Sequence, residues 1–180
     1  MVASVGLFCA ASESIEKCYF DCAAEVGRMI GEFGLTLVYG GAAAGLMEAT
    51  AMAAKENGAT IVGVVPRVLI ERNRVSTLLD EQIVTANLSE RKDKILERSD
   101  ILVALPGGMG TLDEIFHVVA AATIGYHSKM VVLYNANGYW DELLVALNTM
   151  QDKGFIRGGI DKYIQEARDV DSLKKIICDI

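Results

Sequence analysis

No stretch of this sequence is apolar for long enough to cross a bilayer, because glycine or charged residues interrupt every hydrophobic run. A membrane-spanning role is therefore not expected. None of the 4 cysteines forms a Cys-x-x-Cys pair, so we expect reduced thiols and a cytoplasmic location. The chain has no linker, low-complexity run or internal repeat, which predicts one domain over residues 1–180. Its first residues have the pattern of a strand and not that of a signal peptide.

Two nucleotide-binding signatures are also missing. The turn after the first apolar run, Ala10-Ala11-Ser12, lacks the Gly-x-Gly-x-x-Gly pattern of dinucleotide folds, which counts against a nicotinamide enzyme. No Lys-Ser or Lys-Thr pair follows the two glycine-rich turns described below, which counts against Walker-type triphosphate chemistry. The net charge of -7 argues against nucleic acid or an anionic membrane as the main partner.

Short apolar runs alternate with helical stretches along the chain, as in a doubly wound parallel sheet. The pattern predicts a single-domain, Rossmann-like α/β fold. Residues 67–87 are irregular and predict a lid or a crossing segment, whose arginines either approach a ligand or form a solvated face. Strands are predicted at residues 2–9, 35–39, 60–65, 100–104, 129–134 and 163–167. Helices are predicted at residues 14–33, 46–57, 88–98, 115–124, 139–153 and 170–180.

The most informative stretch is residues 105–114, Leu-Pro-Gly-Gly-Met-Gly-Thr-Leu-Asp-Glu, which follows a buried strand and opens an apolar helix. Ligands bind at this edge of an open α/β sheet. Gly107, Gly108 and Gly110 are expected to take positive φ and to direct backbone N–H groups at a phosphate, helped by the helix dipole. The alternative is that Thr111 and Glu114 form a capping box.

A second glycine-rich turn, residues 40–45, also joins a predicted strand to a predicted helix. We expect the two turns to lie at neighbouring strand ends and to form a cleft whose floor is backbone N–H. Together they favour a phosphorylated ligand. The helix after the central turn is apolar nearly all round and carries His117, which is expected to be a core or interface residue. Such a helix must be covered on both sides, which predicts a second subunit. Cys18 and Cys22 are expected to fill the core, with metal binding as the alternative.

Several motifs together resemble the Lonely Guy family of nucleoside 5'-monophosphate phosphoribohydrolases, whose members are often labelled "possible lysine decarboxylase". They are Tyr-Gly-Gly at residues 39–41, Gly-Leu-Met at 45–47, Glu-Arg-Lys at 90–92 and Pro-Gly-Gly-Met-Gly-Thr-Leu-Asp-Glu at 106–114. The likeness runs from about residue 2 to residue 156. It implies a Rossmann-like homodimer, with sites near the subunit interface, that hydrolyses the N-glycosidic bond of AMP or a cytokinin riboside monophosphate without metal or cofactor.

The resemblance also implies roles for particular residues. Arg91 and Glu114 are the expected catalytic pair: a carboxylate can stabilise positive charge on the ribose and orient the attacking water, while an arginine keeps the carboxylate ionised. No group is assigned to protonate the leaving base, although Asp113 is a candidate. The residues expected to bind substrate are Lys92, Gly107, Gly108, Met109, Gly110, Thr111, Asn73, Gly40 and Gly41.

The chain departs from the family pattern at positions that bear on substrate preference, namely Ala42, Glu48, Asn73, Ser89 and Ala120. These changes leave open a second hypothesis, in which the protein binds a nucleotide as a sensor and does not cleave it. Lysine decarboxylation is a third reading. It normally needs pyridoxal phosphate on a lysine, and no lysine in the sequence is marked for that role.

Overall fold

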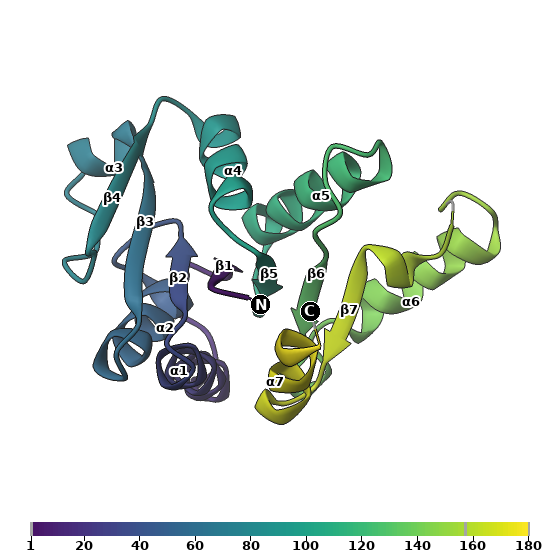
Figure 1. Ribbon diagram of the computed structural model, residues 1–180, viewed down its shortest axis with the longest axis horizontal. Helices are drawn as coiled ribbons and strands as arrows, with labels where there is room; N and C mark the ends of the chain where they lie inside the picture. Colours follow the sequence, from purple (N-terminus) through teal and green to yellow (C-terminus); the bar gives the residue numbers. More distant parts are fainter. Residues whose placement is uncertain (1, 157, 180) are drawn as a thin grey trace.

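A computed structural model describes residues 2–156 and 158–179. All of its strands join one parallel sheet in the order β4-β3-β2-β1-β5-β6-β7 (Figure 1). This confirms the predicted doubly wound, Rossmann-like α/β class. The strands are Ser4–Phe8 (β1), Thr36–Tyr39 (β2), Thr60–Pro66 (β3), Glu81–Thr85 (β4), Ile101–Ala104 (β5), Val131–Tyr134 (β6) and Ile164–Ala167 (β7).

Helices cover both faces of the sheet, with α1, α2 and α7 on one face and α4, α5 and α6 on the other (Figure 1). Two cores result, one on each side of the sheet. No helix in the described part of the chain is both long and apolar enough to span a membrane. The helices are Lys17–Glu32 (α1), Gly45–Glu56 (α2), Arg67–Glu71 (α3), Leu88–Glu97 (α4), Met109–Thr123 (α5), Asp141–Asp152 (α6) and Val170–Cys178 (α7), with short 3-10 turns at Ala136–Gly138 (η1) and Ile160–Lys162 (η2).

The central strands are apolar because both of their faces are covered. All residues of β5 and β6 are buried, and their continuous apolar runs are typical of parallel sheets with helices on each side. Each strand leads into a helix, and the connections between strands and helices collect at the carboxyl edge of the sheet. This edge carries the candidate site.

The predicted irregular segment at residues 67–87 is corrected by the structure. It contains the short helix α3 and the edge strand β4, which pairs in parallel with β3. β4 was missed because most of its residues are exposed at the sheet edge and it begins with the polar pair Glu81-Gln82, so it lacks an apolar run. Ile180, the last residue of the final predicted helix, lies outside the described residues.

Candidate active site

The sequence analysis predicted that the two glycine-rich turns follow neighbouring strands. This prediction is wrong. The turns follow β2 and β5, and β1 lies between these strands. The turn after β1 therefore occupies the middle of the site. Its residue Ala10 links both sides, because the Ala10 N–H donates to the Pro106 carbonyl at 3.1 Å and the Ala10 carbonyl accepts from the Leu46 N–H at 2.9 Å. Three loops thus meet where the strand order changes direction.

A cavity of about 330 Å³ opens at this meeting point, a volume within the range of small-ligand sites. It brings Arg91 and Glu114 together with part of the central glycine loop. The sequence analysis did not predict that the turn after β1 lines the cavity, because this turn carries no dinucleotide-binding motif. The strand order supplies the missing signal, because ligands bind at the switch point of an open sheet. The lining residues are Cys9, Ala10, Ala11, Ser12, Met47, Arg91, Gly108, Gly110, Thr111 and Glu114.

The amino terminus of α5 faces this cavity. The helix begins at Met109 with Gly108 as its N-cap residue, and no side chain caps it. Thr111 already belongs to the first turn, so it does not form the capping box with Glu114 that was the alternative to an anion site. The first N–H groups of the helix have no intrahelical partner and carry the positive end of its dipole. Such N–H groups favour the binding of an anion such as phosphate.

None of the glycines of the central loop has the predicted positive φ, and of the three only Gly107 is required by close packing. Gly107, Gly108 and Gly110 all have other backbone conformations, with φ of -95° at Gly108. A Cβ atom on Gly107 would collide with the Thr111 side chain, so only glycine lets the loop turn tightly against its own helix. Tyr139 anchors this loop, because its hydroxyl donates a hydrogen bond to the Gly107 carbonyl at 2.8 Å.

Glu114 and Arg91 form the charged centre of the cavity. Arg91 Nη2 lies 3.4 Å from Glu114 Oε1, and the two side chains are only 12% and 9% exposed. Burial raises the pKa of Glu114 to about 7, although the positive charge of Arg91 opposes part of that rise. A carboxyl with a pKa near neutrality can exchange a proton during a reaction. The pair therefore has the electrostatics of an acid–base centre.

Cys9 also lines this cavity, but its burial argues against a role as a nucleophile. The thiol is fully buried, and burial raises its pKa well above the usual value, with the charge of Glu114 adding to the effect. A protonated thiol is a poor nucleophile. The charged side chains that line the cavity are the carboxyl of Glu114 and the guanidinium of Arg91.

Gly40 leaves room for Arg91. A Cβ atom at this position would overlap the Arg91 guanidinium. We therefore predict that Gly40→Ala displaces Arg91 and lowers kcat/KM for the reaction at this site by about 10²-fold, the scale for losing one preorganised charge. Steady-state kinetics would measure the loss. Gly34→Ala is the control: its site has positive φ but no neighbour within 4 Å, so it strains the backbone without touching Arg91. Equal losses in both variants would show that Gly40 does not act through Arg91.

Several predicted binding residues lie outside the cavity lining. Lys92 instead pairs with Asp113 at 2.8 Å, and Met109 is 82% exposed. Asn73 is exposed in a left-handed conformation, with φ of 50°. Gly41 supports the second glycine turn, since its carbonyl accepts from the Ser76 N–H at 2.9 Å.

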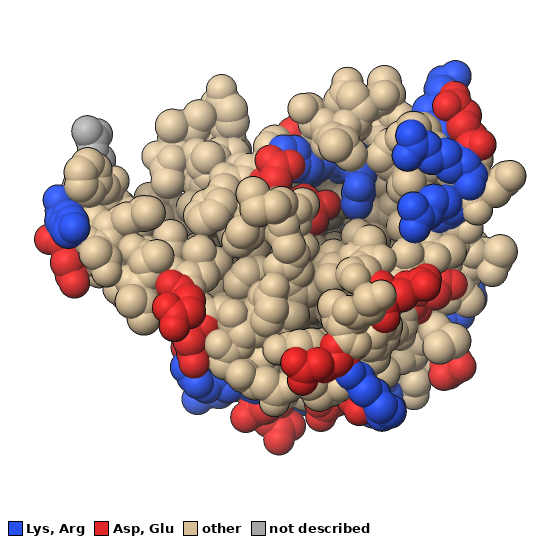
Figure 2. Space-filling model, turned by 180° about the vertical axis from the view of Figure 1, so that it is seen from behind, with Lys and Arg blue, Asp and Glu red and all other residues tan. Residues whose placement is uncertain are grey.

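Basic side chains gather at the end of the molecule that carries α3 (Figure 2). Arg67, Arg72 and Arg74 are exposed in this segment, and none of them lines the cavity. This favours the solvated-face interpretation of the three arginines. Cys18 and Cys22 are half-buried, and no group of three metal-ligating side chains occurs within residues 2–156 and 158–179.

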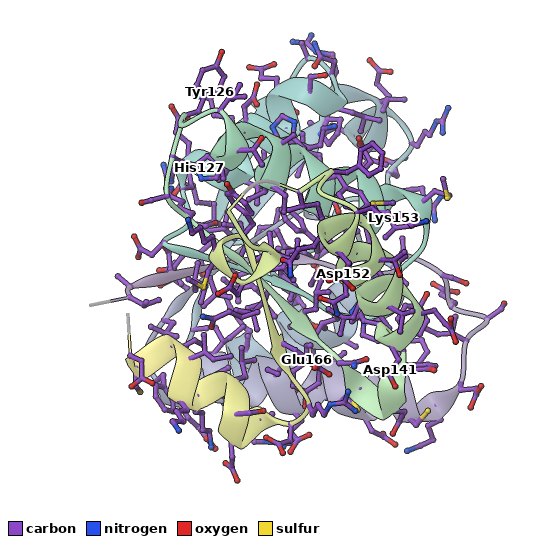
Figure 3. The ribbon with its side chains drawn as sticks, turned by 90° about the vertical axis from the view of Figure 1, so that its right-hand side faces the viewer. Tyr126, His127, Asp141, Asp152, Lys153 and Glu166 are labelled. Atoms are coloured by element: carbon purple, nitrogen blue, oxygen red, sulfur yellow. The ribbon has the colours of Figure 1, made fainter. Side chains whose placement is uncertain are left out.

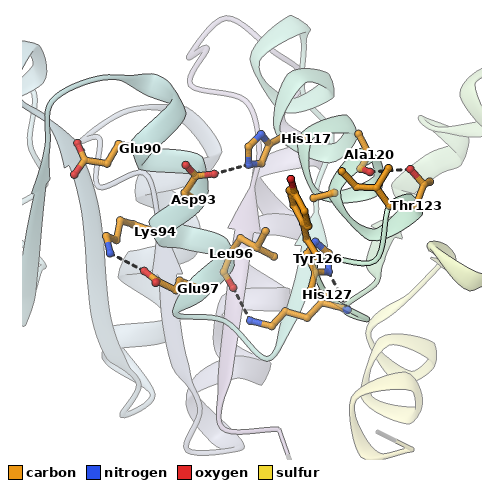
Figure 4. A pocket seen from close by; sticks show the side chains of 13 residues that line it. Glu90, Asp93, Lys94, Leu96, Glu97, His117, Ala120, Thr123, Tyr126 and His127 are labelled. Carbon is orange, nitrogen blue, oxygen red and sulfur yellow. Dashed lines mark hydrogen bonds and ion pairs between the residues drawn. The ribbon is translucent and has the colours of Figure 1, made fainter.

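His117 lies in a groove between α4 and α5, where its Nε2 is 2.9 Å from Asp93 Oδ1 (Figure 4). The groove measures about 960 Å³ and is larger than the active-site cavity. It does not contain Arg91 or Glu114, so size alone does not identify the chemical site. Its surface is mostly apolar at the far end of α5, where Ile124 and Tyr126 are 68% and 80% exposed.

The fold and the cavity define a Rossmann-like α/β protein with an uncapped helix terminus beside a buried acid–arginine pair. A family model described as "Possible lysine decarboxylase" matches residues 47–177. The chain belongs to this family, and its relatives confirm the resemblance to the Lonely Guy phosphoribohydrolases.

Two relatives carry the same activity in their names. One is the cytokinin riboside 5'-monophosphate phosphoribohydrolase LOG5 of Arabidopsis thaliana, with 38% identity over 85% of this chain and 67% of the relative. The other is the cytokinin riboside 5'-monophosphate phosphoribohydrolase of Mycobacterium tuberculosis, with 40% identity over 85% of this chain and 81% of the relative. The chain thus spans about two thirds of the length of the plant protein.

Among solved structures, the molybdenum cofactor carrier protein of Chlamydomonas reinhardtii matches with a TM-score of 0.74 and 24% identity, over 99% of this chain and 98% of that protein. The molybdenum cofactor binding protein of Rippkaea orientalis matches with a TM-score of 0.73 and 21% identity, over 99% of this chain and 97% of that protein. At this level of identity the two structures support the fold alone.

The residues present do not fit the pyridoxal phosphate that lysine decarboxylation normally requires. That cofactor needs a lysine at the reacting centre to form a Schiff base. No lysine is found among the described residues that line the cavity. Lys92 is the neighbour of Arg91, but its ammonium is bound to both oxygens of Asp113. The charged side chains available for chemistry in the cavity lining are those of Arg91 and Glu114.

Proposed function

We propose that this protein hydrolyses the N-glycosidic bond of a purine or cytokinin nucleoside 5'-monophosphate, releasing the free base and ribose 5-phosphate. The observation that carries the proposal is the buried Glu114–Arg91 pair in a cavity at the amino terminus of α5. The names of the relatives indicate the same reaction. In our proposal the catalytic residues are Arg91 and Glu114. The residues that bind substrate are Lys92, which also pairs with Asp113, together with Gly107, Gly108, Met109, Gly110, Thr111, Asn73, Gly40 and Gly41.

The amino terminus of α5 supplies the phosphate site. The 5'-phosphate binds the free N–H groups of the first turn, where the dipole of a 15-residue helix adds positive potential. This contact lies far from the bond that breaks, and it holds C1' of the ribose beside Glu114. Binding energy at the phosphate is thereby used for orientation at the reacting carbon.

Glu114 acts at the glycosidic bond. As the bond from C1' to the base nitrogen breaks, its electron pair leaves with the base and positive charge develops on the ribose. The carboxylate stabilises that charge and accepts a proton from the water whose oxygen bonds to C1'. Arg91 holds part of the Glu114 population in the charged form at neutral pH. No described residue is assigned to protonate the base.

The reaction should depend on pH through Glu114. Its raised pKa, about 7, means that the active carboxylate is lost as the pH falls through neutrality. We expect kcat/KM for AMP to rise about tenfold for each pH unit below 7 and to level off above it. A pH–rate profile at constant ionic strength measures this limb. A flat profile between pH 5 and 8 would contradict the role of Glu114 as a base.

The activity itself is tested by incubating the protein with AMP and with an isopentenylated AMP, and by quantifying base and ribose 5-phosphate. Equal amounts of the two products are expected. Calorimetry separates hydrolysis from the sensor hypothesis. Tight AMP binding without product after long incubation would support a sensor and overturn the proposed reaction.

We also propose a homodimer that forms through the α4–α5 face, with the sites near the interface. The groove runs along the two helices that carry Arg91 and Glu114 and ends at Tyr126 and His127 (Figures 3 and 4). Ile124 lines both this groove and a smaller apolar hollow between α5 and α6. Exposed apolar surface of this extent favours a protein partner.

Replacing Ile124 with aspartate should break the dimer. The change places a charge at the centre of the apolar surface, where burial without a partner is strongly unfavourable. We expect light scattering to show a monomer for Ile124→Asp and a dimer for the wild type. Met52→Asp is the matched control, since Met52 is 50% exposed on α2, on the opposite side of the sheet. A dimer that survives Ile124→Asp would place the interface elsewhere.

The proposal further includes a cytoplasmic location and one hydrolase domain over residues 1–180, which needs neither metal nor cofactor. The four cysteines support a reducing environment because all are free thiols. Nucleic acid and membranes are not proposed as partners of this acidic chain.

A further inference from the structure

Two ion pairs lie side by side between α4 and α5. Consecutive residues on each helix supply them: Arg91 faces Glu114, and Lys92 faces Asp113. The second pair is the tighter one, because Lys92 Nζ lies 2.8 Å from both carboxylate oxygens of Asp113, whereas Arg91 and Glu114 are 3.4 Å apart. The four side chains therefore form one cluster of two positive and two negative groups.

The Lys92 side chain is mostly buried, at 14% exposed, while Asp113 is 59% exposed. A buried ammonium requires a charged or hydrogen-bonded partner, and here both oxygens of Asp113 provide it. With its oxygens so engaged, and with its side chain outside the cavity lining, Asp113 is not placed to protonate a leaving base. Its contact is with the neighbour of the catalytic arginine.

We propose that the ion pair between Lys92 and Asp113 has a positioning role beside the substrate contact proposed for Lys92: it holds α4 against α5 and balances the charge next to Glu114. The inference rests on the proposed function, because it assigns Glu114 as the reacting acid. It concerns how that acid is placed and charged, and not which atoms of the substrate it touches.

The charged groups that face Glu114 come from two helices, Arg91 and Lys92 from α4 and Asp113 from α5. The thiol of Cys9, after β1, also faces this site but is neutral, because burial raises its pKa. Besides the larger effects of burial and Arg91, Asp113 raises the pKa of Glu114 and Lys92 lowers it. Removing either partner breaks the same ion pair but changes the local charge in opposite directions. This difference separates an electrostatic role from a purely structural one.

The test compares Asp113→Asn with Lys92→Met by titrating the Glu114 carboxyl with carbon-13 NMR, its resonance being identified by its absence in Glu114→Gln. We expect Asp113→Asn to move the midpoint to lower pH and Lys92→Met to move it to higher pH, each by about half a unit or more. The acid limb of kcat/KM should move with it. Asp113→Glu should restore the wild-type midpoint, and Asp21→Asn, which breaks an exposed pair on α1, should not move it.

Shifts of the same sign in both variants, or none in either, would overturn the inference and leave the pair a structural contact. The titration needs no substrate, so its result stands apart from the proposed function. A wild-type protein that releases no ribose 5-phosphate from any monophosphate would overturn the function instead, whatever the NMR midpoints are.

Discussion

Glu114→Gln is expected to lower kcat for AMP hydrolysis by about 10³-fold, in line with the loss of a general base and of a charge that stabilises the transition state. Glutamine keeps the size of the side chain but can neither accept a proton nor carry negative charge. Because the proposed phosphate site lies at the helix terminus, away from the side chain of residue 114, KM should change little. Rapid-quench or steady-state assays of ribose 5-phosphate measure both parameters.

The control for this variant is Glu56→Gln, which changes an exposed acid on α2 and should leave kcat unaltered. A Glu114→Gln protein that retains more than a tenth of the wild-type kcat would remove Glu114 from the mechanism. A rise in KM without a fall in kcat would instead make it a binding residue.

The same variant should be more stable than the wild type at alkaline pH. Burial raises the pKa of Glu114 to about 7, so the folded state prefers the protonated acid. Its contribution to stability is complete below the unfolded pKa and is lost as the pH rises through about 7. Thermal unfolding at pH 8 should therefore show a higher Tm for Glu114→Gln. The increase in Tm would measure the free-energy cost of keeping the Glu114 carboxylate charged in the buried cavity.

Arg91→Ala should have the second large effect, a fall in kcat/KM of at least about 10²-fold at pH 7. The change leaves Glu114 buried without its nearest positive charge, so the pKa of that carboxyl rises further and less of the reactive carboxylate is present. The acid limb of the pH profile should move to higher pH. A profile measured from pH 5.5 to 9 shows this displacement.

Arg98→Ala is a matched control because Arg98 follows the same helix, α4, and pairs at 2.7 Å with Glu81 at the sheet edge. It should leave both kcat/KM and the pH profile unchanged. If Arg91→Ala lowers the rate equally at every pH, then Arg91 contacts the substrate without adjusting Glu114.

Much of the fold follows from the spacing of apolar residues. Ile101-Leu102-Val103 and Val131-Val132-Leu133 are continuous buried runs, which is the signature of strands covered on both faces. β4 could not be predicted in this way, because an exposed edge strand does not require a continuous apolar run. Thr111 and Glu114 have the spacing of a helix start, but the N-cap residue of the helix is Gly108, three residues before Thr111.

The site was predicted in part. Arg91 and Glu114 lie far apart in the sequence, and only the motif resemblance linked them before the structure placed them 3.4 Å apart. The role of the turn after β1 could not be read from Ala10-Ala11-Ser12, because it arises from strand order and not from residue type. The pairing of Lys92 with Asp113 likewise depends on how α4 packs on α5.

A crystal structure of Glu114→Gln with bound AMP tests the account most directly. The account predicts the phosphate on the backbone N–H groups at the start of α5, with the side chain at position 114 within hydrogen-bonding distance of the ribose or of a water below C1'. A phosphate bound at the exposed arginines of residues 67–74, with residue 114 turned away from the sugar, would contradict it.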